Sequence, residues 1–141
     1  AAAAALALTP YAQLAEAVQR LDAHPEIAVV HRSSVIETKP WGKTDQPDFA
    51  NMALAVETSL KPEDLLDACL EVERAMGRER LERWGPRLID IDIIAYDRLE
   101  LRSDRLTVPH PFAHERDFVL APLREIDPAT AEWVVERAGR Q

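Results

Sequence analysis

The sequence predicts an α+β fold in which helices pack on a largely antiparallel sheet. Three stretches are β-branched or alternate between apolar and polar residues. One amphipathic helical segment precedes them and another lies between the last two. With the N-terminal residues as a further strand, the expected order is β, α, β, β, α, β with additions at the C-terminal end. The chain has 141 residues, 47% of them hydrophobic. That is enough for one core and leaves little room for a second, so we expect residues 1–141 to form a single domain.

The N-terminal part predicts a strand and then a helix. The alanine-rich residues 1–8 (AAAAALAL) are the first expected strand. Thr9 and Pro10 suit the N-cap and first turn of a helix, and apolar residues then recur at helical spacing to about Asp22. Residues 27–38 (IAVVHRSSVIET) are rich in β-branched side chains and predict the second strand.

A long loop separates this strand from the next. Residues 39–48 (KPWGKTDQPD) contain two prolines and one glycine, too many residues for a tight hairpin, and long loops in small domains tend to be functional. Residues 49–58 (FANMALAVET) alternate again, with Phe49 and Ala53 on one face and Met52 and Leu54 on the other. We expect this strand to be antiparallel to the one before it.

The second half predicts another helix and the last long strand. Pro62 opens a helix that we expect to run to about Met76, with Gly77 placed to cap its end. A polar stretch, 78–87, precedes a strand centred on residues 89–96. A small hairpin at 99–101 and 106–108 and helices near 114–123 and 130–138 complete the expected elements. Two helices on one face of such a sheet form the ferredoxin-like arrangement.

Two aspartates lie in the middle of the last long strand. Side chains alternate across a strand, so Asp90 and Asp92 share one face while the neighbouring isoleucines take the other. Two carboxylates this close repel each other unless a cation lies between them or one is protonated. Mg²⁺ fits best, because it prefers carboxylate oxygens and keeps positions open for water or phosphates. The alternative is an exposed face on which both carboxylates contact water or nearby arginines.

The segment before these aspartates is basic in an otherwise acidic chain. Its four arginines and two glutamates give a net charge of +2 (4 − 2): Arg78, Arg80, Arg83 and Arg87 against Glu79 and Glu82. Arginine neutralises phosphates well because it is always charged and can donate two hydrogen bonds to one phosphate. Trp84 suggests a segment that closes over a flat ligand. A solvated charged loop is the alternative.

Two aromatic residues suggest a second feature for a flat ligand. Phe49 and Phe118 would sandwich a planar heterocycle if they face each other, and Asn51, on the strand face of Phe49, could bind the edge of that ring. Core packing is the ordinary alternative for both phenylalanines. His110 is equally ambiguous, because a neutral imidazole can cap a loop or contact a phosphate.

The composition of the chain disfavours some classes of binding partner. The formal net charge is -8 and the pI is about 5.0, which disfavours nucleic acid and anionic membranes as partners. Cys69 is the single cysteine, so an intrachain disulfide is excluded and a reducing, cytoplasmic location is expected. The apolar stretches are shorter than the ~20 residues that span a bilayer.

Several segments together resemble one family. TKPWGKTDQPDFANMA (38–53), ERWGPRLIDIDI (82–93), RLTVPHP (105–111) and ERDFVLAPL (115–123) are similar to those of the 6-hydroxymethyl-7,8-dihydropterin pyrophosphokinases of folate biosynthesis. The resemblance covers about residues 9–128. It implies transfer of the β,γ-diphosphate of ATP to the pterin hydroxymethyl oxygen with release of AMP, by a cytoplasmic enzyme that we expect to be a monomer.

The resemblance also implies roles for individual residues. Two Mg²⁺ ions would bind at Asp90 and Asp92, and the catalytic residues would be Arg78, Arg87 and Asp92. The ATP-binding positions would be Glu73, Arg80, Arg87, Ile93, Arg105, Thr107, His110 and Arg116. The pterin-binding positions would be Thr38, Pro40, Trp41, Phe49, Asn51, Trp84 and Phe118. One departure stands out: the family has a Gly-Ser-Asn turn after its first strand, where this chain is rich in alanine.

The sequence leaves two other classes of function open. A ferredoxin-like ligand-sensing module that kept the pocket but lost turnover would explain the missing turn. A phosphodiesterase that uses two metals on nucleic acid would also need paired aspartates, but the acidic surface disfavours it.

Overall fold

The computed structural model describes residues 2–10, 14–38, 49–79 and 89–138. Its main sheet has the strand order β2-β4-β1-β5, and every pair of neighbours is antiparallel. The strands are β1 (Ala2–Pro10), β2 (Ile27–Arg32), β4 (Phe49–Thr58) and β5 (Ile89–Tyr96), and the short β3 (Ile36–Thr38) pairs with the start of β4. β1 is central and β5 lies at one edge.

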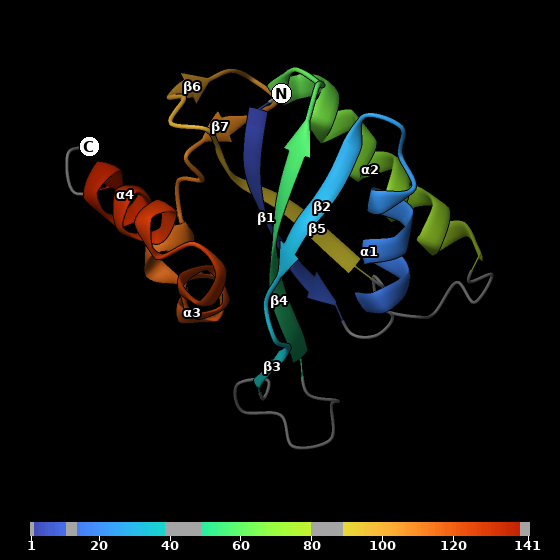
Figure 1. Cartoon of the computed structure of the whole chain (residues 1–141), viewed down its shortest axis with the longest axis horizontal. Helices are drawn as coiled ribbons and strands as arrows, with labels where there is room; N and C mark the ends of the chain where they lie inside the picture. Colours follow the sequence, from blue (N-terminus) through green and yellow to red (C-terminus); the bar gives the residue numbers. More distant parts are fainter. Residues whose placement is uncertain (1, 11–13, 39–48, 80–88, 139–141) are drawn as a thin grey trace.

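The helices lie on both faces of this sheet (Figure 1). One face carries α1 (Leu14–Asp22) and α2 (Pro62–Glu79). The other carries α3 (Asp117–Ile126) and α4 (Pro128–Ala138), preceded by the 3-10 turn η1 (Ala113–Glu115). A two-stranded hairpin of β6 (Leu101–Arg102) and β7 (Thr107–Val108) follows β5. The structure is therefore α+β, as the sequence predicts.

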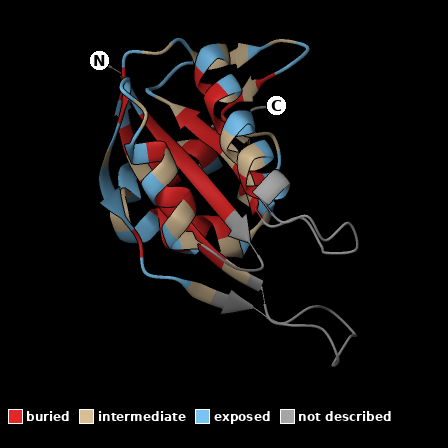
Figure 2. Cartoon of the chain, turned by 90° about the vertical axis from the view of Figure 1, so that its right-hand side faces the viewer, coloured by how far each residue is buried: buried red, intermediate tan, exposed pale blue. Residues whose placement is uncertain are grey.

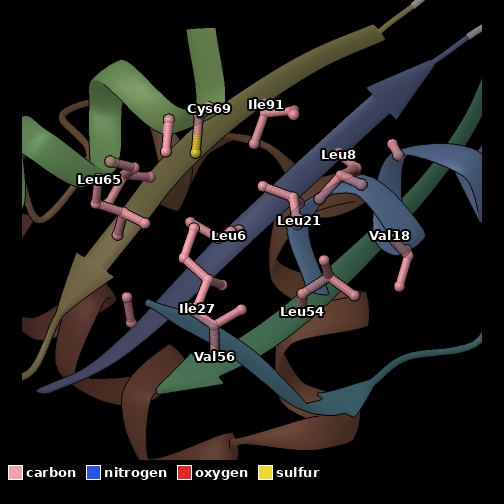
Figure 3. Close-up of a cluster of buried hydrophobic side chains, with 14 of the residues drawn as sticks. Leu6, Leu8, Val18, Leu21, Ile27, Leu54, Val56, Leu65, Cys69 and Ile91 are labelled. Carbon is pink, nitrogen blue, oxygen red and sulfur yellow. The ribbon is translucent and has the colours of Figure 1, made fainter. Parts of the chain in front are cut away.

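The alternation of side chains in β1 separates two cores. Leu6 and Leu8 are fully buried in the core under α1 and α2, together with Leu21 and Leu65 (Figure 3). Ala5 and Ala7 belong to the second core, under α3 and α4. Buried residues follow the strands and the inward sides of the helices, while the outer sides of the helices are exposed (Figure 2). Such burial on both faces suits a central strand that is apolar along its whole length.

A register shift changes the direction of side chains in β5. Leu6 pairs with Ile93 but Ala5 pairs with Ala95, so Ile94 is the extra residue of a bulge. Ile93 therefore faces the first core, whereas both Ile94 and Ala95 pack into the second. The bulge lies two residues after Asp92 and ends the regular alternation that positions the two aspartates.

Several expected elements agree closely with the structure. β4 has the predicted bounds, Phe49–Thr58. Met52 and Leu54 face the first core and Ala53 faces the second, as the alternation predicts. None of the helices among the described residues is both long enough and apolar enough to cross a membrane.

The prediction for Thr9 and Pro10 was wrong. They do not begin the helix but end β1, where Thr9 pairs with Asp90 and Pro10 with Ile89. Pairing with β5 extends the strand through a dipeptide that locally suits a helix start. The described part of α1 begins at Leu14.

Two further boundaries differ from the prediction. The expected strand over 27–38 is interrupted at Ser33, whose N–H donates to the Ala53 carbonyl while its hydroxyl oxygen accepts the Ala53 N–H, both at 2.9 Å. A side chain thus replaces a backbone acceptor in the ladder. Gly77 does not end its helix, because α2 continues to Glu79. The C-terminal helices begin and end within a few residues of the predicted bounds.

Candidate active site

β5 presents two carboxylates on one face of the sheet. Ile89, Ile91 and Ile93 are buried in the first core, so the alternate positions, Asp90 and Asp92, point to the opposite face and are only partly buried. Asp92 lies opposite Ala7, which belongs to the second core. The strand therefore uses one face for packing and keeps the carboxylates accessible on the other.

Glu73 of α2 binds the backbone of β5 between these two aspartates. Its Oε2 accepts the Ile91 N–H at 2.7 Å. β5 is at the edge of the sheet, so only one of its sides pairs with another strand, β1. The Glu73 carboxylate thus supplies an acceptor where no neighbouring strand does, and it fixes α2 to the segment that carries Asp90 and Asp92.

A cavity of about 260 Å³ lies beside Asp92. Its lining comes from three parts of the chain: α2, β5 and the segment from the hairpin to the following loop. Five residues singled out in the sequence line it, namely Asp92, Ile93, Arg105, Thr107 and His110. The fold therefore gathers a carboxylate, a guanidinium, a hydroxyl and an imidazole around one space.

His110 is held against the edge of β5 by its own backbone. Its N–H donates to the Ile94 carbonyl at 2.9 Å, and its ring Nδ1 accepts the Phe112 N–H at 3.2 Å. With Nδ1 used as an acceptor, the neutral ring carries its proton on Nε2. Burial lowers the pKa of His110, and Arg116 lowers it further, whereas Asp92 acts in the opposite direction. The ring is thus a neutral Nε2–H donor beside the Asp92 carboxylate.

Arg105 reaches from the hairpin to α2. Its Nη2 donates to Asp67, and its Nη1 lies 3.7 Å from the Glu63 carboxylate. These contacts raise the pKa of Arg105 and lower that of Asp67. Sequence patterns did not single out either acidic residue. Both lie on one side of α2, four residues apart, which is a pattern seen on most surface helices and carries no functional signal.

Two residues predicted for the pterin lie on the face of the second core. Asn51 is 2% exposed, an unusual degree of burial for an amide side chain. Phe118 is partly buried and packs against the second core from α3. Phe49 pairs with Thr38 through the backbone, but the side chains of these two residues lie outside the described part, so the expected aromatic sandwich is not tested.

Arg116 is partly buried and lies at the N-cap of α3, whereas the predicted residues of the long loop and of the basic segment lie wholly or partly outside the described residues. Of Arg78 only the backbone, in α2, is described. Nothing is described for Pro40 and Trp41 of the long loop, or for Arg80, Trp84 and Arg87 of the basic segment.

The donor set suits a cation that keeps other ligands. Within the described residues, groups of three or more acidic, histidine or cysteine side chains able to hold a metal are absent. Asp90 and Asp92 supply two carboxylates from one strand face. Mg²⁺ commonly binds through one or two carboxylates and takes its remaining ligands from water and substrate phosphates, so this pair fits such an ion when phosphates are present.

Comparison with known proteins assigns the family. The sequence model of the 7,8-dihydro-6-hydroxymethylpterin-pyrophosphokinase family matches residues 7–128. The 2-amino-4-hydroxy-6-hydroxymethyldihydropteridine pyrophosphokinase of Methylorubrum extorquens is 53% identical over 117 residues, 83% of this chain and 74% of that protein. The enzyme of the same name from Bacillus subtilis is 46% identical over 113 residues, 80% of this chain and 68% of that protein.

A bifunctional relative shows a similar match. The bifunctional protein FolKE of Lactococcus lactis is 47% identical over 113 residues, 80% of this chain but only 32% of that protein.

Proposed function

The chain belongs to the 7,8-dihydro-6-hydroxymethylpterin-pyrophosphokinase family, a family of ATP-dependent diphosphotransferases of folate biosynthesis, and we propose that the cavity beside Asp92 binds the ATP. One observation carries this proposal. In a member of that family, the fold brings Asp92, Ile93, Thr107 and His110 around a single cavity, although they come from separate parts of the sequence. The second substrate is 6-hydroxymethyl-7,8-dihydropterin, and the products are its diphosphate ester and AMP.

The two aspartates of β5 are the residues that would hold the metal. Asp90 and Asp92 would hold two Mg²⁺ ions, which would neutralise the charge that develops on the transferring phosphates. Two partly buried carboxylates at alternate positions of one strand support this assignment. The strand is braced on the opposite face by buried isoleucines, so the carboxylates keep their spacing when the cation binds.

The remaining side chains orient the ATP. Neutral His110 donates from Nε2 to a phosphate oxygen at the Asp92 end of the cavity, and Arg116 adds a positive charge near it. Thr107 and Ile93 shape the wall of the cavity. Arg78 and Arg87 would complete the neutralisation of the transferring group, and Glu73 holds β5 in place from α2. This chemistry relies on positioning and charge and needs no dedicated protein base.

The pterin would lie on the same sheet face, next to Asp90. Asn51 lies on that face in β4, and Phe118 packs against the same face from α3. A buried amide matches the donor and acceptor edge of a pterin, and the aromatic rings of Phe49 and Phe118 would stack on its faces. Thr38, Pro40, Trp41 and Trp84 would enclose the remaining sides.

We further infer the topology of the sheet and the organisation of the domain. The strand order β2-β4-β1-β5, with α1 and α2 on one face, supports a ferredoxin-like core followed by a C-terminal addition. Residues 1–141 would form one pyrophosphokinase domain that acts as a monomer in the cytoplasm.

Product analysis tests the function directly. AMP and the diphosphate ester should form in equal amounts only when ATP, Mg²⁺ and the hydroxymethylpterin are all present. Release of ADP or inorganic phosphate would indicate another phosphoryl transfer. Binding of both substrates without AMP formation would favour a sensing module, for which the alanine-rich N-terminal strand provides a reason.

A further inference from the structure

Two observations connect α2 with the hairpin across the cavity. Leu66 of α2 and Arg105 of the hairpin segment both line the cavity. The flanking α2 residues, Glu63 and Asp67, both contact the Arg105 guanidinium. Arg105 therefore forms part of the cavity wall with its side chain while its charged end is fixed to the helix.

The position along α2 places this contact away from the metal-binding strand. Glu73 contacts β5 at Ile91, between the two aspartates. Asp67 and Glu63 precede Glu73 by six and ten residues, which corresponds to about 9 and 15 Å along the helix axis. The cavity thus has one end at Asp92 and His110, suited to phosphates, and an opposite rim at Arg105.

The charges at this rim are unfavourable for a phosphate. Two carboxylates face one guanidinium, so the local net charge is negative although Arg105 itself is a phosphate-binding type of residue. A triphosphate bound there would have to displace both carboxylates or be repelled by them. A neutral nucleoside does not meet this repulsion.

We propose that Asp67 and Glu63 are positioning residues for ATP: they fix Arg105 and so hold the wall that contacts the nucleoside, while the phosphates bind at the Asp92 end. This inference rests on the proposed function of the cavity. The hairpin is short: Leu101 pairs with Val108 and Arg102 with Thr107, and hydrogen bonds between Ser103 and Leu106 close its turn. The ion pairs at Arg105 attach its tip to a long helix and shape the site before the nucleotide arrives.

Binding of two ligands separates this role from a direct phosphate contact. The ligands are α,β-methylene-ATP, in which the bond to be broken is blocked, and inorganic tripolyphosphate, both with Mg²⁺ and measured by calorimetry. The variants are Asp67→Asn and Glu63→Gln. The matched control is Glu16→Gln, which removes the carboxylate that pairs with Arg20 at 2.8 Å on α1.

Asp67→Asn should weaken binding of the ATP analogue about two- to fivefold, the range that a partly exposed ion pair supports, and should leave tripolyphosphate binding unchanged. The side chains of Asp67 and Arg105 are 55% and 46% exposed, so the unfolding temperature should shift no more than in the control. Glu63→Gln should act in the same direction but less, because its contact is longer. In turnover, the KM for ATP should rise while kcat stays constant.

Other outcomes would overturn the inference. Equal weakening of both ligands would mean that Arg105 contacts the phosphates. Unchanged or tighter binding of the analogue by Asp67→Asn would mean that the carboxylates do not position the wall or that they compete with ATP. If the unmodified chain bound the analogue normally but released no AMP, the proposed reaction would fail while the positioning role could still be measured.

Discussion

The Glu73 carboxylate accepts the backbone N–H of Ile91 at 2.7 Å, and this bond joins α2 to the strand that carries both aspartates. Ile91 is itself buried, so its N–H has little access to water. A buried N–H that loses its acceptor costs about 1–3 kcal/mol. The bond therefore contributes to the stability of the edge strand as well as to its placement.

Replacement of Glu73 tests this relationship. Glu73→Ala removes the acceptor and should lower the free energy of unfolding by about 1–3 kcal/mol in urea titration. Glu73→Gln keeps a carbonyl oxygen at the same reach and should recover most of that loss. Equal destabilisation by both variants would show that the charge of Glu73, and not the bond to Ile91, accounts for its contribution.

Local patterns predicted those elements whose tertiary partners agree with them. The alternation in Phe49–Thr58 gave the correct strand and the correct faces because both faces of β4 are covered by helices. Thr9 and Pro10 have a helix-start pattern, but pairing with β5 draws them into a strand. Gly77 resembles a helix end, yet α2 continues past it. At Thr9 and Pro10, the pairing with β5 overrode a local preference, whereas the two further residues of α2 after Gly77 have no such contact to explain them among the described residues.

Only part of the candidate site could be predicted from local patterns, for a similar reason. Periodicity alone placed Asp90 and Asp92 on one face, because neighbours two apart in a strand are set by the backbone. The other predicted residues that line the cavity beside Asp92 were singled out by the family resemblance, since their proximity depends on contacts between distant segments. The pairing of Arg105 with Asp67, 38 residues apart, has no signal in a single sequence.

Asp92 should be essential for turnover but not for folding. Asp92→Asn keeps the shape of the side chain and removes the charge, so AMP release should fall by more than the ~10–100-fold typical for loss of an outer-shell partner of a metal. The urea midpoint should change little, because the side chain is partly exposed on the ligand face. Glu132→Gln, on the exposed side of α4, is the control for a lost carboxylate. A large loss of stability in Asp92→Asn would make Asp92 a structural residue.

Glu125 should influence how the stability of the fold depends on pH in the acid range. The Ser34 N–H and hydroxyl donate to its two carboxylate oxygens at 2.7 and 2.6 Å, and these bonds lower the pKa of Glu125 below its ordinary 4.5. Because the folded pKa is the lower one, the stabilisation is present above about pH 4.5 and is lost as the pH falls through the folded pKa.

Ser34→Ala removes one of the two donors, so the pKa of Glu125 should rise toward 4.5, as measured by NMR titration of its side-chain carboxyl carbon. The stability of this variant should depend less on pH in the acid range. Ser59→Ala, which removes a hydroxyl bonded to Glu26, should leave the Glu125 titration unchanged. An unaltered pKa in Ser34→Ala would assign the shift to the backbone N–H alone.

Cys69 should report unfolding of the first core. Cys69 belongs to α2, and its fully buried side chain lies near Ile91 (Figure 3). Burial, followed by the negative charges of Glu73 and Asp92, raises the pKa of the thiol to about 12. At pH 8 only about one thiol in 10⁴ would be ionised, and the thiolate is the form that reacts with disulfide reagents. Labelling of the native chain by an aromatic disulfide reagent should therefore be negligible and should rise with urea in parallel with the loss of secondary structure. Because the chain has one cysteine, the signal has a single source. Rapid labelling in the absence of urea would mean that α2 separates from the sheet without global unfolding, and the bond from Glu73 to Ile91 would then be too weak to hold them together.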